Sequence, residues 1–92
     1  MIAIHRRPRL TPTARVRFDS HSGKHLLIHS ERGIVLNESA AQLLVLCDGT
    51  RTVSAIAERL TIRYGSRSAT DVLRQVRAFL AALATRGLVV EA

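Results

Sequence analysis

Hydrophobic and polar residues alternate with a period of two in the first part of the chain, the spacing expected of half-buried strands. Val16 and Phe18 alternate with arginines on either side, and turn-forming residues follow at 19–23. Leu26 and Ile28 then alternate with their own neighbours. The pattern predicts two short strands joined by a tight connection.

A third short strand is predicted just before the period changes. Residues 30–33 form a second turn, and Ile34, Val35 and Leu36 follow it. In a strand, Ile34 and Leu36 share one face and Val35 takes the other. Three short strands with two tight connections predict an antiparallel meander over residues 15–36.

Helical spacing begins at Asn37, a favourable N-cap residue. Thr52 can cap a second helix, and Ser68 with Asp71 resembles the capping box that opens a third. Gly49 is placed to end the first helix. The apolar residues at helical spacing are Ala40, Leu43, Leu44 and Cys47, then Val53, Ile56, Ala57 and Leu60, then Val72, Val76, Phe79, Leu80 and Leu83.

The last elements complete a predicted order of three strands followed by three helices. Gly65 and Gly87 are placed to close the second and third helices, and residues 88–90 form a short closing strand. We therefore predict an α+β fold, a three-stranded antiparallel sheet followed by three helices that is winged helix-turn-helix-like. The connection over residues 64–68 is longer than a tight helix-turn-helix turn.

Composition predicts one domain of 92 residues with an aliphatic core, because hydrophobic residues make up 47% and aromatic residues only 3%. We place this domain at residues 15–92 and assign residues 1–14 to a basic extended arm that contains Arg6, Arg7 and Arg9. The net charge of +7, from 14 basic and 7 acidic residues, suits an acidic peptide, nucleic acid or an anionic membrane.

No residue pattern predicts catalysis or a bound metal. The predicted hairpin puts His25 and His29 on one face and His21 in a turn, and no cysteine or carboxylate pattern completes a zinc site. Cys47 ends an apolar helix stripe, where a buried structural thiol is expected. We expect no catalytic residue and no cofactor. The single cysteine and the lack of an apolar run of roughly 20 residues favour a cytoplasmic protein that enters no membrane.

The stretch from residue 36 to 60 resembles pyrroloquinoline quinone (PQQ) biosynthesis protein D, PqqD. Its most specific matches are Leu36-Asn37, Leu46-Cys47-Asp48-Gly49 and Arg51-Thr52-Val53. The flanking matches are Pro8-Arg9-Leu10, Arg17-Phe18-Asp19, Ser30-Glu31-Arg32 and Arg86-Gly87-Leu88. Two positions depart from the family: Ser30 stands where proline is frequent, and Phe18 stands where tryptophan is common.

The resemblance implies a non-catalytic peptide chaperone, a recognition element for ribosomally made, modified peptides (RiPPs). Such a domain binds an acidic precursor peptide that contains Glu and Tyr. The peptide adds as a strand beside the third strand and against the third helix. A radical S-adenosylmethionine (SAM) enzyme then cross-links the Glu and the Tyr. The implied peptide-binding residues are Gly33, Ile34, Val35, Leu36, Asn37, Arg74, Gln75, Arg77 and Ala78.

Alternatives remain open at this point. A DNA-binding winged-helix protein would also explain the net charge and the basic arm, with Thr70, Arg74, Gln75 and Arg77 as contacts. An assembly domain that only bridges subunits is a third hypothesis, and PqqD-like domains also serve other peptide-modifying pathways. The arm is a hypothesis for enzyme docking. Exchange of the arm or the short sheet between protomers would give a homodimer.

Overall fold

A computed structural model of the chain describes residues 3–65 and 68–91, so residues 66–67 of the predicted helix connection lie outside it. In chain order the elements are β1 (Pro8–Leu10), β2 (Arg15–Asp19), β3 (Lys24–His29), β4 (Arg32–Leu36), α1 (Glu38–Val45), α2 (Val53–Tyr64), α3 (Ala69–Thr85) and β5 (Val89–Glu91). The three-stranded antiparallel sheet, in the order β2-β3-β4, and the three helices confirm the predicted α+β fold.

The helices begin at the predicted caps. The cap bonds run from the backbone N–H of Ala40 to Asn37 (2.8 Å), from that of Ala55 to Thr52 (3.0 Å) and from that of Asp71 to Ser68 (3.2 Å). Each bond satisfies an amide that has no partner within its helix. No helix among residues 3–65 and 68–91 is both long enough and apolar enough to cross a membrane.

The predicted helix ends are only partly right. Gly65 and Gly87 have φ of 60° and 72° and lie just after α2 and α3, as predicted. The prediction that Gly49 ends α1 is wrong, because that helix stops at Val45. The N–H of Leu46 donates to the carbonyls of both Gln42 and Leu43, which tightens the last turn before the chain leaves the helix.

The N-terminal segment is joined to the rest of the fold, which the sequence did not predict. β1 pairs antiparallel with β5, with Arg9 opposite Val90. The carbonyls of Ile4 and Arg6 accept bonds from the N–H groups of Ser54 and Val53 at 3.0 and 2.9 Å. These are the first amides of α2, which lack acceptors inside the helix. The segment thus completes the start of α2.

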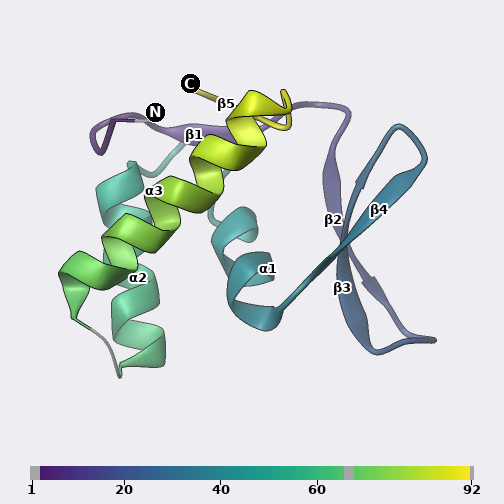
Figure 1. Cartoon of the computed structure of the whole chain (residues 1–92), viewed down its shortest axis with the longest axis horizontal. Coiled ribbons are helices and arrows are strands. Elements are labelled where there is room, and N and C mark those ends of the chain that lie inside the picture. Colours follow the sequence, from purple (N-terminus) through teal and green to yellow (C-terminus); the bar gives the residue numbers. More distant parts are fainter. Residues whose placement is uncertain (1–2, 66–67, 92) are drawn as a thin grey trace.

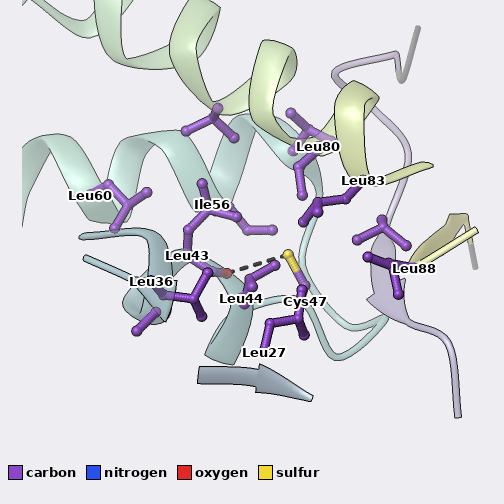
Figure 2. Packing of buried hydrophobic residues seen from close by; sticks show 14 of the residues in the cluster. Leu27, Leu36, Leu43, Leu44, Cys47, Ile56, Leu60, Leu80, Leu83 and Leu88 are labelled. Carbon is purple, nitrogen blue, oxygen red and sulfur yellow. Dashed lines mark hydrogen bonds between the residues drawn. The ribbon is translucent and has the colours of Figure 1, made fainter. Parts of the chain in front are cut away.

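The core lies between the helices and one face of the three-stranded sheet. Figure 1 shows the three helices on the same side of β2, β3 and β4. Figure 2 shows Leu27 of β3 and Leu36 of β4 packed with leucines and Ile56 from the helices. Leu27, Ile56 and Leu80 are almost completely buried. One face of the sheet therefore packs on the helices.

The residues of β3 divide between two apolar faces. The predicted strand forms as β3, but Leu27, and not Leu26 or Ile28, is the residue that faces the helices, at 1% exposure. Leu26 and Ile28 are half-buried and do not pack against the core. Three consecutive apolar residues left no polar position to mark the outer side, so the pattern alone could not choose the face.

Candidate functional site

One edge of the three-stranded sheet, β4, is open. The turn between β3 and β4 has two residues, Ser30 and Glu31, with φ of 50° and 66°. Proline can adopt neither angle, because its ring holds φ near −65°. A two-residue turn with both φ positive makes the flanking pair, His29 and Arg32, a hydrogen-bonded pair. This pair fixes which backbone groups of β4 face outward.

Hydrogen-bonded and non-hydrogen-bonded pairs alternate along an antiparallel ladder. Ile34 and Leu36 therefore use their N–H and C=O groups to bond β3, as Arg32 does. Gly33 and Val35 direct theirs away from the sheet. β4 is the last strand in the sheet order, and no turn, cap or loop bond within residues 3–65 and 68–91 uses these outward groups. The edge thus offers donors and acceptors to an added strand.

The side chains along this edge differ in exposure. Leu36 is 6% exposed and belongs to the core, whereas Ile34 is 37% and Val35 is 60% exposed. Ile34 and Leu36 share the face turned toward the helices, and Val35 lies on the opposite face, as predicted. An added strand would therefore meet apolar side chains on both faces of β4.

Asn37 connects this edge to a groove between the helices. It has φ of −73° and ψ of 172°, so extended backbone continues through it before α1 begins. Its Oδ1 accepts from the N–H of Ala40 at 2.8 Å and from the hydroxyl of Ser39 at 3.0 Å. These bonds hold Asn37 where β4 ends and the groove starts.

The groove has a volume of about 490 Å³, within the usual range of small binding sites. Its walls come from α1, the end of α2 and the stretch of α3 from Val72 to Phe79. The lining residues are Asn37, Ser39, Ala40, Leu43, Leu60, Thr61, Tyr64, Gly65, Val72, Gln75, Val76 and Phe79. Most of these side chains are apolar, so the groove suits an apolar side chain of a bound peptide.

The four residues predicted on the third helix do not all meet at the groove. Gln75 lines it, whereas Arg74, Arg77 and Ala78 do not. Gln75 and Arg77 are about 200° apart around α3, because each residue turns a helix by about 100°. Arg77 is half-buried on the other flank, and exposed Arg74 forms an ion pair with Asp71. The structure thus brings together Asn37 and Gln75 of the predicted set near the end of β4.

Several lining residues were not predicted as site residues. Val72, Val76 and Phe79 were assigned only to the apolar stripe of the third helix, and Leu43 to that of the first. A stripe wider than the core can cover is the signal that was available. Phe79 is only half-buried although it packs against the core, and this partial exposure is visible only in the structure.

The cysteine lies in the core, away from the groove. Burial, and to a smaller extent the charge of Asp48, raises the pKa of the Cys47 thiol to about 12. The thiol donates to the carbonyl of Leu43 at 3.3 Å, the dashed line in Figure 2. A thiol with so high a pKa is a poor nucleophile at neutral pH, which agrees with the predicted structural role. No cluster of three metal-ligating side chains occurs in the described parts of the chain.

The fold and the site define a small binding domain, in which an open strand edge leads into an apolar groove. The chain belongs to the PqqD family, as its resemblance predicted: the model of coenzyme PQQ synthesis protein D (PqqD) matches residues 24–89. A PqqA binding protein of Rhodopseudomonas palustris (strain TIE-1) is 38% identical over 86 residues, which cover 94% of this chain and 83% of the relative.

Two further comparisons involve a bifunctional relative and a solved structure. The bifunctional coenzyme PQQ synthesis protein C/D of Methylorubrum extorquens is 44% identical over 57 residues, 62% of this chain but 15% of that protein. The solution NMR structure of the PqqD truncation of Methylobacterium extorquens PqqCD, a stand-alone RiPP recognition element, superposes with a TM-score of 0.83. It is 32% identical, and the match covers 98% of this chain and 95% of that one.

Proposed function

We propose that this chain binds the precursor peptide of PQQ biosynthesis as a strand added to the free edge of β4. It then presents that peptide to the radical SAM enzyme that cross-links a Glu and a Tyr. The observation that supports this most is the open edge at Gly33 and Val35, which continues through Asn37 into the apolar groove. The names of the relatives, PqqA binding protein and RiPP recognition element, agree with it.

The expected energetics are those of strand addition. Gly33 and Val35 each supply one N–H and one C=O, and each main-chain bond formed contributes about 1 kcal/mol net. An apolar peptide side chain placed in the groove against Val76 and Phe79 adds the free energy of its burial. Ordering the peptide opposes both contributions, so the complex should be of moderate affinity and readily released.

The net charge attracts the peptide to the chain, but it does not determine the geometry of the complex. The net charge of +7 attracts an acidic peptide from a distance and raises the association rate at low salt. Arg74 stays in this proposal as a long-range contributor, since it lies outside the groove and is paired with Asp71. Chemistry on the peptide belongs to the enzyme that receives it, and this chain supplies position and strand geometry.

An NMR titration of the labelled chain with the precursor peptide tests the proposal. We expect amide shifts at Gly33 to Asn37 and at the groove residues of α3, Val72 to Phe79, with little change in α2 before Leu60. A parallel titration with duplex DNA addresses the main alternative. DNA binding with a steep salt dependence, and no response to the peptide, would replace peptide capture by DNA recognition. If the peptide causes no amide shift in the chain and DNA does not bind, the hypothesis of an assembly domain that only bridges subunits would remain.

A further inference from the structure

The three-stranded sheet has a second apolar face, which does not belong to the core formed by the described residues 3–65 and 68–91. Residues directly opposite in neighbouring strands point to the same side of a sheet. The register pairs Arg15 with Ile28, Arg17 with Leu26, Leu26 with Val35 and Ile28 with Gly33. These six residues form what we call the outer face. It lies opposite the face packed on α1 (Figure 1).

The centre of the outer face is apolar and open. Leu26 and Ile28 are half-buried without joining the core, and Val35 is 60% exposed. A Cβ placed on Gly33 would lie 3.5 Å from Cδ1 of Ile28 and 3.9 Å from Cδ1 of Leu26. The two side chains therefore lie over the glycine and shield one another. They form a shallow apolar surface of the kind that partner proteins cover.

The rim of the outer face is basic. Arg15, Arg17 and Lys24 are exposed there, and Asp19, which pairs with Lys24, accepts hydrogen bonds from the hydroxyl of Ser22 and the N–H of His21 within its own turn. These bonds, of which the one from Ser22 has the largest effect, lower the pKa of Asp19. The carboxylate therefore stays charged, and its oxygens already accept bonds within the turn. A second copy of the chain would place basic rim against basic rim. An acidic rim is the complementary one.

The outer face adjoins the proposed peptide site. The side chain of Val35 lies on the outer face, while its N–H and C=O lie on the free edge of β4. A second hollow of about 550 Å³ is lined by Lys24 and Val35 and also by Asn37 of the groove. A protein seated on the outer face would therefore lie next to the bound peptide. In the Methylorubrum relative the matching segment is part of a longer bifunctional protein.

We propose that the outer face is the surface by which this domain docks on the peptide-modifying enzyme. The matching enzyme surface is apolar at its centre and rimmed by Asp and Glu. The choice of this enzyme as the partner rests on the proposed function. The surface itself is defined by Leu26, Ile28 and the arginines. It differs from the basic arm suggested by the sequence.

The test measures two affinities separately on the full chain: binding to the purified radical SAM enzyme by calorimetry, and binding to the precursor peptide by NMR. Arg15→Glu with Arg17→Glu should weaken enzyme binding about tenfold or more, because like charges would then face the acidic rim. Ile28→Thr, which keeps the strand preference, should also weaken it. Peptide affinity should stay within about twofold for both variants, since none of the three positions lies on the free edge of β4 or in the groove.

Arg7→Glu with Arg9→Glu is the matched control, because it makes the same change of charge on the arm. It should leave enzyme binding within about threefold, the effect of net charge on association alone. Enzyme binding that is lost with the arm variant and kept with both outer-face variants would overturn the proposal. The proposal would also be overturned if the enzyme did not bind the wild-type chain. It would be overturned too if the outer-face variants kept their affinity for the enzyme and lost only their binding to phosphatidylglycerol vesicles. Failure of peptide binding alone would refute the proposed function and leave the docking result intact.

Discussion

The two edges of the three-stranded sheet have the same backbone chemistry in different surroundings. On β4 the outward N–H and C=O groups belong to Gly33 and Val35; on β2 the same register assigns them to Val16 and Phe18. Phe18 is 56% exposed and contacts the ring of His25, with centroids 5.0 Å apart. Both edges could accept a strand by backbone geometry alone.

The difference lies in what each edge leads to. β4 runs through Asn37 into the groove between α1, α2 and α3, whereas β2 ends in the turn at residues 20–23. An added strand on β4 can bury a side chain in that groove, and one on β2 cannot reach it. Free backbone groups make an edge competent to bind, and the adjoining pocket makes it selective.

The largest expected effect comes from proline on each edge. Val35→Pro removes an N–H that points outward, so it should spare the β3–β4 ladder and weaken peptide binding by about 2 kcal/mol, roughly 30-fold. Phe18→Pro removes the corresponding outward N–H from β2 and should leave peptide affinity unchanged. Fluorescence anisotropy with a labelled peptide gives both values, and circular dichroism confirms folding.

A side-chain control separates the N–H from the valine itself. Val35→Thr keeps the donor and nearly the same shape, so its peptide affinity should stay close to that of the wild type. Equal losses in the threonine and proline variants would mean that the side chain, and not the edge, makes the contact. Equal losses with proline on β4 and on β2 would remove the distinction between the edges.

Filling the groove should have the next largest effect. Ser39 is exposed on α1 and lines the groove, so Ser39→Phe should occupy space needed by the peptide and weaken binding by about 1.5 kcal/mol, roughly tenfold. Val45→Phe adds a ring to the same helix at a residue that is 61% exposed and outside the groove. It should leave affinity unchanged. Calorimetry measures the peptide affinity of both variants. If neither substitution changes it, the groove takes no part in peptide binding.

The two helix caps allow a comparison at equal stability. Asn37→Ala and Thr52→Ala each remove one cap bond and should each lower the free energy of unfolding by about 1 kcal/mol. Only Asn37 lines the groove, so only its replacement should also reduce peptide affinity, by about threefold, because the start of α1 loosens. Urea unfolding and peptide titration on the same samples decide this. An equal effect of both variants on affinity would mean that stability alone controls binding.

The smallest effect concerns the thiol. Because the folded-state pKa of Cys47 is about 12 and its ordinary value is 9.0, its contribution to stability is complete below pH 9 and is lost as the pH rises from 9 toward 12. The urea midpoint of the wild type should therefore fall above pH 9 more than that of Cys47→Ala. At pH 8 a thiol reagent should label the unfolded chain and spare the folded one. Rapid labelling of the folded chain would contradict the burial of this residue.

Local signals predicted much of the fold, because they depend on neighbours in the chain. The caps at Asn37, Thr52 and Ser68 each need only one side-chain oxygen and an amide three residues on, and all three formed. The pairing of β1 with β5 was missed, since residues 8 and 91 meet only through the whole fold. The end of α1 at Val45 was missed for the same reason, since it is not determined by neighbours in the chain alone.

The candidate site was predictable at its edge and not in its walls. The short strand at residues 34–36 could be located from the turn before it and the cap after it, although β4 begins earlier, at Arg32, and the PqqD resemblance implied that this strand binds the peptide. The groove joins three helices, and no spacing in the sequence states which side of α3 faces α1. That is why Arg77 and Gln75, only two residues apart, ended on different flanks.

Hydrogen exchange at single amides tests the central claim most directly. The free chain should exchange the outward amides of Gly33 and Val35 on one edge, and of Val16 and Phe18 on the other, faster than the paired amides of Ile34 and Leu36. Saturating precursor peptide should protect Gly33 and Val35 and leave Val16 and Phe18 unchanged. Protection on β2 in place of β4, or no protection at Gly33 and Val35 in a saturated complex, would contradict strand addition at the β4 edge.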